Sequence, residues 1–298
     1  MGETPESKRE KGGIRKDSDV SFKVSSKLLG TGRDVHVYLP PSYGEKPLKG
    51  YPVLYLHDGQ NVLSSAGKDA AFGWGSLELD RTVDFLCRKG RMEEIIMIAI
   101  DNGPRRLDEY SGRRRPFGEA KRTPFEEYED FLITELKPRV DRGFRALSGP
   151  SNTAVMGSSM GGLCSLVLAW GNPGVFGGAA SLSGAFPTYR PNFLDDVLME
   201  YQGPAKPIRV YLDSGVVGPH GSDDGRSRTR RAAAELRRIG WTREKLMVFE
   251  DRKILTRSDL EKSDLPPSKW AEAQNSQHNE FYWRKRAWRA LTFLFPRK

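Results

Sequence analysis

The chain has 298 residues, of which 37% are hydrophobic and 10% aromatic, enough to bury a sizeable core in one large α/β domain or two smaller ones. Its 48 basic and 39 acidic residues are interspersed, and no zinc-finger, helix-turn-helix or aromatic RNA-binding pattern accompanies the net charge of +9, so we expect no nucleic-acid partner. No apolar run approaches the roughly 20 residues that span a bilayer, so we expect no membrane partner.

The chain begins with a polar, charged stretch over residues 1–18. It has no apolar signal region, so we predict a disordered tail there, a single domain over residues 19–298 and a cytoplasmic location. Cys87 and Cys164 lie in apolar, helix-like surroundings and are expected to be buried thiols. The four histidines lack metal-ligand spacing, so we expect no metal and no cofactor. Nothing in the pattern indicates a particular oligomeric state.

After this stretch, segments with the apolar pattern of strands alternate with segments that have the apolar spacing of helices. Residues 20–30 and 33–40 flank Thr31-Gly32 and predict a hairpin of two strands. Continuous apolar runs bounded by turn residues predict buried strands, and these cover residues 51–61, 93–103, 153–159, 177–186, 208–215 and 245–251. Helical spacing of apolar residues predicts helices, and these cover residues 76–90, 125–144, 161–174, 227–240 and 279–295. The alternation predicts a mostly parallel central sheet with helices on both faces and an N-terminal antiparallel hairpin.

One junction in this pattern has an unusual composition. Residues 157–161 read Gly-Ser-Ser-Met-Gly, a G-x-S-x-G sequence between a predicted strand and a predicted helix. Such a turn holds its central serine clear of the sheet, and its small neighbours let strand and helix cross closely. The N–H groups at the start of the following helix favour developing negative charge. We therefore interpret Ser159 as a candidate nucleophile, whereas a purely structural glycine turn is the alternative.

A nucleophilic serine needs a base and an acid that orients the base. After Ser159 the histidines are His220 and His278, and His278 stands in a polar loop between the last predicted strand and the last helix, where the base belongs. The acid candidates are Asp213, Glu250, Asp223 and Asp224. The sequence favours Asp223, with Asp224 next, although both also suit a helix cap or a turn.

The same chemistry needs two N–H donors for an oxyanion. One is expected from the backbone of Met160, directly after the nucleophile. The other is expected from the loop His57-Asp58-Gly59-Gln60 after an earlier strand, where we favour the Gln60 amide. An ordinary turn built around Asp-Gly is the alternative for this loop.

Several segments together resemble the putative-esterase (esterase D–like) family of α/β-hydrolases, and we list them in chain order: "RDVHVYLPPSY", "VLYLHDGQN", "IAIDNGPRRLDEYSG", "MGSSMGGLCSLVLAWGNPGVFGGAASLSGAF", "YLDSG" and "HNEFYWRKRAWRALTFLF". The resemblance runs from about Val20 to the C-terminus and is strongest to the enterochelin-esterase branch. It implies an α/β-hydrolase fold and a serine hydrolase with a Ser-His-Asp triad, in which Ser159 matches the nucleophile and His278 the base. The acid loop is longer than the family's usual form, which leaves the choice between Asp223 and Asp224 open.

An arginine-rich stretch follows the predicted strand over residues 93–103. Guanidinium groups bind carboxylates, so Arg105 and Arg106 are candidates for binding an anionic ester substrate. Pairing of these arginines with neighbouring acidic residues is an equally good interpretation. Trp74 and Tyr110 are candidate pocket walls, with core packing as their alternative.

The main hypothesis from the sequence is hydrolysis of a small-molecule carboxylic ester through an acyl-enzyme on Ser159. An acyltransferase or a peptidase would use the same site with a different acceptor. A non-catalytic binding protein on the same scaffold and a basic nucleic-acid-binding protein are the remaining alternatives.

Overall fold

The computed structural model describes residues 19–116, 118–186 and 191–297, and the tail predicted over residues 1–18 lies outside these ranges. Five apolar runs of the sequence form strands that are buried on both faces, as expected for the inner strands of a parallel sheet. These strands are β3 (Val53–His57), β4 (Ile96–Ile100), β5 (Thr153–Ser158), β6 (Gly178–Leu182) and β7 (Arg209–Gly215). The run predicted as a buried strand over residues 245–251 forms β8 (Leu246–Asp251), which is only partly buried because it is the edge strand of the sheet.

The strands form one sheet in the order β1-β2-β4-β3-β5-β6-β7-β8. β1 (Asp19–Ser26) pairs with β2 (Thr31–Tyr38), and β2 pairs with β4, both antiparallel, whereas all the remaining pairs are parallel. The prediction of a mostly parallel sheet that carries an N-terminal antiparallel hairpin is confirmed. The carboxyl ends of β3, β5 and β7 therefore meet at one edge of the sheet, which is where such folds place their sites.

The turn of the hairpin lies earlier than the sequence indicated. Thr31 and Gly32 are the first residues of β2, paired with Ser26 and Ser25, and the chain reverses over residues 27–30. Gly30 has φ +66°, a conformation that glycine adopts at little cost. This glycine, rather than Thr31-Gly32, therefore marks the reversal.

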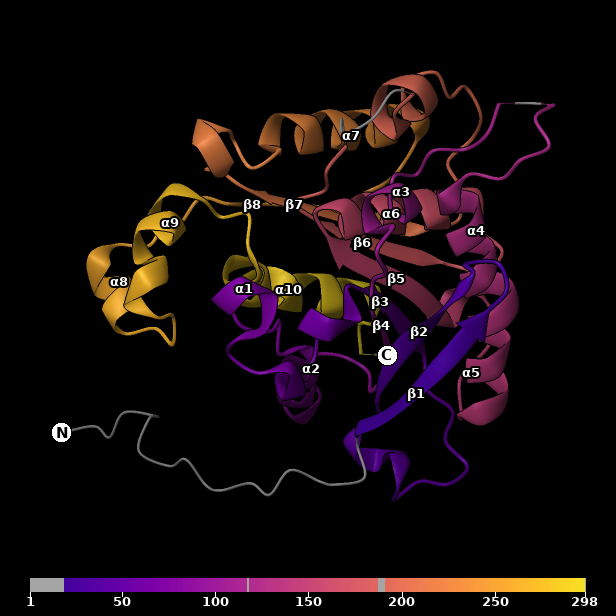
Figure 1. Cartoon of the computed structure of the whole chain (residues 1–298), viewed down its shortest axis with the longest axis horizontal. Helices are drawn as coiled ribbons and strands as arrows, with labels where there is room; N and C mark the ends of the chain where they lie inside the picture. The colour runs from indigo at the N-terminus through magenta and orange to yellow at the C-terminus, as the bar shows by residue number, and fades with distance from the viewer. Residues whose placement is uncertain (1–18, 117, 187–190, 298) are drawn as a thin grey trace.

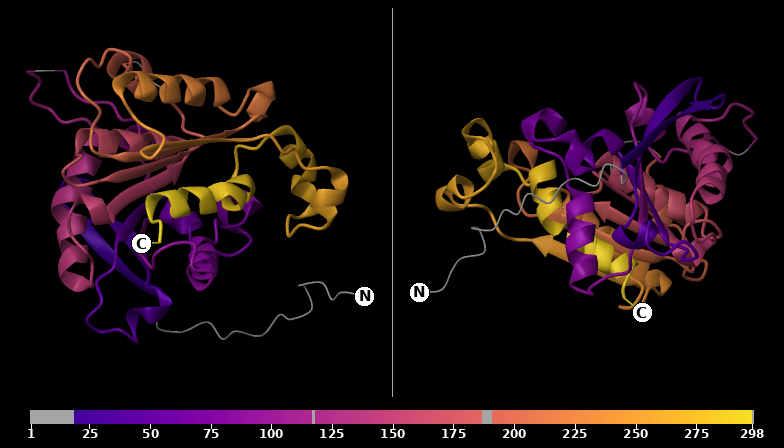
Figure 2. Two further views of the ribbon diagram at one scale, coloured as in Figure 1. Left: turned by 180° about the vertical axis from the view of Figure 1, so that it is seen from behind. Right: turned by 90° about the horizontal axis from the view of Figure 1, so that it is seen from below.

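Helices cover both faces of the sheet (Figures 1 and 2). One face packs against α2 (Leu79–Arg88) and α10 (Glu280–Leu294) through Leu54, Leu56 and Met156. The other face carries α4 (Pro124–Asp130), α5 (Lys137–Gly143), α6 (Met160–Gly171) and α7 (Arg226–Ile239). Burying each large apolar side chain contributes about 1.5–3 kcal/mol. The two layers together thus hold the strands, and the loops that follow them, in place.

Two helical stretches differ from a regular α-helix with a single buried face. α4 and α5 are parts of one helical stretch, joined by a π-helical segment, η5 (Phe131–Leu136). In α6, every residue from Met160 to Trp170 is buried, because this helix packs directly on β5 and β6 at the centre of the molecule. No helix in the described part of the chain is long and apolar enough to cross a membrane.

Several short elements lie where the sequence analysis expected none. They are α1 (Ala70–Gly73), α3 (Arg106–Glu109), the π-helical segment η7 (Phe193–Leu198), α8 (Arg257–Glu261) and α9 (Trp270–Asn275). α8 and α9 lie between β8 and α10 and stand apart from the sheet (Figure 1). Thr256 and Asp259 form a capping box at the start of α8, a local signal that fixes where this short helix begins.

Candidate active site

Ser159 occupies the sharp turn between β5 and α6. Its φ of 53° and ψ of −121° lie outside the regions that residues with a side chain favour, so the turn is strained. Backbone hydrogen bonds tie it to the neighbouring strand and loop: Ser159 N donates to Leu182 O at 2.9 Å, and Ser159 O accepts from Ala185 N at 3.1 Å. The neighbouring strand β6 and the loop after it therefore fix the serine in this conformation.

The small residues around Ser159 allow strand and helix to meet backbone to backbone. A Cβ atom on Gly157 would lie 2.6 Å from the carbonyl carbon of Gly161, and one on Gly161 would lie 3.1 Å from His57 Cβ. Any larger residue at position 157 would have to displace backbone, which cannot yield as a flexible side chain can. The glycines of the G-x-S-x-G turn are thus explained by packing.

We expect Gly157→Ala to lower the free energy of unfolding by about 1–3 kcal/mol, since overpacking a tight contact costs about this much. The variant should also lose reactivity at Ser159, because relief of the clash moves the turn. Thermal melting and labelling by a serine-reactive probe measure the two effects. Gly44→Ala is the matched control: Gly44 has φ −74° and open space around its Cβ position, so its variant should match wild type.

His278 joins the nucleophile to a buried carboxylate. Its Nε2 lies 2.9 Å from Ser159 Oγ, and its Nδ1 lies 2.6 Å from Asp224 Oδ1. The edge of the Trp283 ring system packs against the imidazole, with ring centroids 5.1 Å apart. The neighbouring Gln277 fixes the loop, because its Oε1 accepts from Val216 N at 2.6 Å. Ser159, His278 and Asp224 therefore form a continuous chain of hydrogen bonds.

The structure brings Asp224, and not the favoured Asp223, to His278. Asp224 has φ +53° and is buried, and its Oδ2 accepts from Gly215 N at 2.5 Å and from Ser183 Oγ at 2.7 Å. Asp223 instead accepts from Ser227 N at 2.9 Å in the first turn of α7, which is the capping alternative. The left-handed conformation of Asp224 accounts for the difference, since it turns one carboxylate inward and leaves its neighbour on the surface.

The environment of Asp224 favours its ionised form. Burial acts to raise the pKa of Asp224, but the hydrogen bond and charge of His278, together with the Arg286 charge and the Ser183 hydroxyl, hold that pKa below its usual value. A carboxylate at this position can stabilise a positive charge on the imidazole. The hydrogen bond to His278 and the negative charge of Asp224 therefore both suit a general base at His278.

The other acid and base candidates have different partners from the triad. Asp213 is fully buried at the end of β7 and interacts with Arg286. Glu250 pairs with Arg230 on the surface, and the contacts with Arg230 and Arg252 lower its pKa to about 2. His220 is exposed in the loop before α7.

The two expected oxyanion donors both lie at helix starts. Met160 is the first residue of α6, and Gln60 lies in the one-turn 3₁₀ helix η3 (Gly59–Asn61). N–H groups in a first helical turn have no acceptor within their own helix, which makes both residues candidates for donating to a ligand. Gln60 Oε1 accepts from Asn102 N at 3.2 Å, which ties η3 to the chain after β4. Asp58 has φ +56° and forms the turn that leads into η3.

The arginines proposed to bind substrate are already paired with carboxylates. Arg106 donates to both carboxylate oxygens of Asp58, at 2.6 and 2.7 Å, and Arg105 donates to Glu127 at 3.0 Å. The sequence indicates an oxyanion loop around Asp58, with an Asp-Gly turn as the alternative, but it does not indicate that the Asp58 carboxylate compensates Arg106. This favours the paired interpretation of the cluster.

The two aromatic candidates are buried and lie in packed clusters. Tyr110 has no exposed surface and packs its ring against His57 and Tyr128. Trp74 belongs to a satellite core with residues of α8 and α9. In this structure neither side chain forms an open pocket wall.

The site also contains a residue that the sequence analysis did not consider. Glu280 is the first residue of α10, two positions after His278, and its Oε1 lies 3.4 Å from Asn61 Nδ2 in η3. Burial raises the pKa of Glu280 to about 7, with the Asp58 charge acting in the same direction. The one sequence signal for Glu280 is that it follows the predicted base, His278, by two residues.

Comparison with known proteins identifies the family of this chain. The family model described as "Putative esterase" matches residues 26–290. The chain belongs to this family. An alignment over 183 residues, which covers 57% of this chain, is 30% identical to an endo-1,4-beta-xylanase/feruloyl esterase of Xylanibacter ruminicola, but it covers only 22% of that protein. The uncharacterized protein YbbA of Bacillus subtilis is 23% identical over 71% of this chain and 81% of its own.

Solved structures share the fold of this esterase-family chain. A ferulic acid esterase aligns with a TM-score of 0.67 and 18% identity, over 93% of this chain and 97% of its own. An enterobactin esterase of Shigella flexneri aligns with a TM-score of 0.66 and 17% identity, over 94% of this chain and 59% of its own. These structures confirm the predicted α/β-hydrolase fold.

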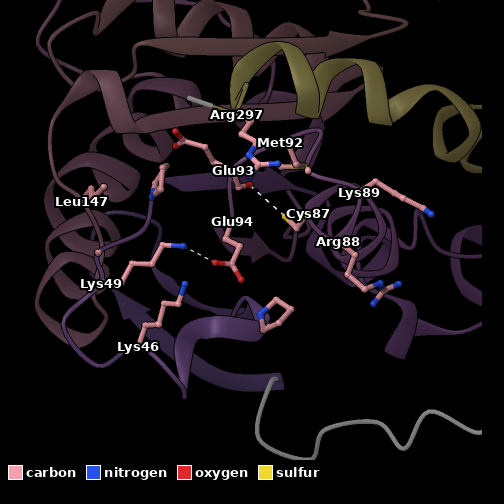
Figure 3. Close-up of a pocket in the computed structure, with 14 residues that line it drawn as sticks. Lys46, Lys49, Cys87, Arg88, Lys89, Met92, Glu93, Glu94, Leu147 and Arg297 are labelled. Carbon is pink, nitrogen blue, oxygen red and sulfur yellow. Dashed lines mark hydrogen bonds and ion pairs between the residues drawn. The ribbon is translucent and has the colours of Figure 1, made fainter.

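A large cavity of this esterase-family chain lies away from Ser159 (Figure 3). Its volume is about 840 Å³, and residues such as Lys49, Pro52, Arg88 and Glu94 line it. Pro52 and Glu94 precede β3 and β4, so the cavity opens at the amino ends of the strands, whereas Ser159 follows the carboxyl end of β5. The hydrogen-bonded side chains around Ser159 therefore indicate the candidate site, whereas the volume of this cavity does not. No three metal-binding side chains among the described residues are arranged to hold an ion.

Proposed function

We propose that this chain is a carboxylic-ester hydrolase that forms an acyl-enzyme on Ser159. The observation that carries the proposal is the hydrogen-bonded chain from Ser159 Oγ through His278 to Asp224. Membership of an esterase family supports it independently. The eight strands form one sheet, which supports the related proposal that residues 19–298 form a single domain.

The first half of the reaction acylates the serine. His278 Nε2 accepts the hydroxyl proton while Ser159 Oγ attacks the ester carbonyl carbon, and the ionised Asp224 stabilises the imidazolium that forms. The Met160 and Gln60 N–H groups are proposed to donate to the oxyanion of the tetrahedral intermediate. Collapse of this intermediate breaks the ester C–O bond, and His278 returns its proton to the leaving alcohol.

The second half of the reaction releases the acyl group. Water takes the place of the alcohol, and His278 Nε2 accepts one of its protons as the water oxygen attacks the acyl carbon. The new intermediate then collapses, the bond to Ser159 Oγ breaks, and the serine recovers its proton from His278. The products are a carboxylic acid and the enzyme in its starting state.

The group that receives the acyl chain, and the bond that is cleaved, distinguish an ester hydrolase from an acyltransferase or a peptidase. The names of two similar proteins, a feruloyl esterase and a ferulic acid esterase, make hydroxycinnamate esters reasonable substrates to test. Purified protein should therefore be assayed on short-chain nitrophenyl esters and methyl ferulate, with and without competing alcohols and amines. We expect free acid as the main product. Predominant acyl transfer to the added alcohol, or cleavage of peptides alone, would contradict hydrolysis as the function.

The pairing of the arginines predicts little selectivity for anionic esters. Because Arg105 is half-exposed and its partner Glu127 compensates its charge, Arg105→Gln should change the ratio of kcat/KM for neutral and anionic acyl esters by less than about twofold. Steady-state kinetics on matched nitrophenyl acetate and hemisuccinate esters measures the ratio. A selective loss of fivefold or more on the anionic ester would instead support the anionic substrate that the sequence suggested.

A further inference from the structure

A buried guanidinium lies behind the proposed triad acid. Arg286 projects from α10, which packs against β6 and β7 (Figure 1), and only 1% of its side chain is exposed. Its Nη2 lies 3.5 Å from Asp224 Oδ2, on the side of the carboxylate opposite the oxygen that binds His278. Burying a charge costs several kcal/mol unless partners compensate it, so the buried Arg286 guanidinium needs groups that compensate its charge.

The second partner of Arg286 is another buried carboxylate. Asp213 Oδ1 lies 3.0 Å from Arg286 Nε, and Asp213 has no exposed surface. Burial raises the pKa of Asp213 to about 6, although Arg286 and the Tyr211 hydroxyl act to lower it and the nearby Asp224 acts to raise it further. One guanidinium therefore lies between two buried carboxylates.

Ser183 completes the connection. Its hydroxyl donates to Asp224 Oδ2 at 2.7 Å and accepts from Trp283 Nε1 at 3.1 Å and from Arg286 Nη2. Ser183 has φ +46°, an uncommon conformation for a residue with a side chain, and its N–H donates to Asp213. A strained residue thus joins both carboxylates and the guanidinium in one network.

We propose that Arg286 is a positioning residue that keeps Asp224 ionised and oriented toward His278, with Asp213 as the carboxylate that anchors the guanidinium. This inference rests on the proposed function of Ser159, His278 and Asp224. Without the guanidinium, two carboxylates in a shared buried site would repel each other and retain a proton between them, as paired buried carboxyl groups do. A proton on Asp224 would remove the acceptor that orients His278.

Other charged or titratable groups face this network from each neighbouring element. They are Tyr211 on β7, Asp251 on β8 at 4.0 Å from Arg286 Nη1, Tyr282 and Arg289 on α10, and His278 and Glu280 around the site. All of them are unchanged in the variants below, so differences between pH profiles report on Arg286 and Asp213.

The test compares pH profiles of kcat/KM for a nitrophenyl ester. In Arg286→Met, which keeps most of the side-chain volume, we expect the acid limb to move upward by at least about one pH unit. The carboxylate pair then retains a proton to higher pH, so activity should be low near pH 7 and recover toward pH 9. A purely structural role would lower activity by the same factor at every pH.

Further variants separate charge from packing. Adding Asp213→Asn to Arg286→Met should move the acid limb back toward the wild-type position, because it removes the repelling carboxylate. Arg286→Lys retains the positive charge and should shift the limb less than methionine does. Lys285→Met removes an exposed charge one residue away on the same helix and should leave the profile unchanged.

One variant keeps the inference testable if Arg286→Met does not fold. Asp213→Asn alone leaves the guanidinium to compensate Asp224, so its acid limb should move to lower pH than in wild type. An unchanged or higher limb would overturn the inference, as would an Arg286→Met profile of unchanged shape. Wild-type protein without ester turnover would instead contradict the proposed function itself, so the two failures are distinguishable.

Discussion

Replacing Ser159 by alanine is expected to lower kcat for ester hydrolysis by about 10⁴- to 10⁶-fold, because the nucleophile and its base act as one unit. The substitution removes only Oγ, whose partner is His278 Nε2 at 2.9 Å. The backbone bonds that hold the turn to Leu182 and Ala185 do not involve the hydroxyl, so the fold should persist. Steady-state kinetics with a nitrophenyl ester, beside a thermal melt, measures both quantities.

The neighbouring serine provides the matched control. Ser158 is the last residue of β5 and pairs with Leu182 in the sheet, one position from the nucleophile. Ser158→Ala should keep kcat within about threefold of wild type, since its hydroxyl is not part of the hydrogen-bonded chain. Equal losses in the two variants would show that the turn as a whole, rather than Ser159 Oγ, supports activity.

Replacing Asp224 by asparagine is expected to lower kcat by about 10³- to 10⁴-fold. An asparagine amide can donate to His278 Nδ1 and so favour the tautomer whose Nε2 carries a proton and cannot accept one from Ser159. The size of the substituted group hardly changes, so the buried contacts with Gly215 N and Ser183 can largely remain. The measurement is kcat near neutral pH, where the wild-type carboxylate is ionised.

Asp223→Asn is the control for this variant. Asp223 accepts from Ser227 N at the start of α7, so its substitution should cost at most about 1 kcal/mol of stability and leave kcat within about twofold. The pair of variants decides between two adjacent residues of identical chemistry. A loss in Asp223→Asn as large as that in Asp224→Asn would contradict the assignment of the acid.

The sequence predicted the elements whose signals are local. The strand, turn and helix around Ser159 follow from an apolar run, three glycines and a second apolar run, and the structure reproduces them. The choice between Asp223 and Asp224 could not be made in the same way. Both residues suit the loop, and it is the left-handed φ of Asp224, together with contacts to residues far along the chain, that turns its carboxylate inward.

The burial of Arg286 is even harder to predict from local sequence signals. In a helix that reads as amphipathic, an arginine is expected on the solvent face, yet here it is fully buried. Its partners Asp213 and Asp224 come from another part of the chain, and only the packing of α10 on β7 brings them together. For Tyr110 and Trp74 the sequence left two interpretations, pocket wall and core packing, and the structure supports core packing, because both side chains are buried in apolar clusters.

The most direct test of the account is to identify the residue that reacts with a fluorophosphonate probe. Wild-type protein, Ser158→Ala and Ser159→Ala should be treated with the probe, and the labelled peptide located by mass spectrometry. We expect one adduct in wild type and in Ser158→Ala, located on Ser159, and none in Ser159→Ala. Well-folded wild-type protein without an adduct, or an adduct that persists in Ser159→Ala, would contradict an activated serine at this turn.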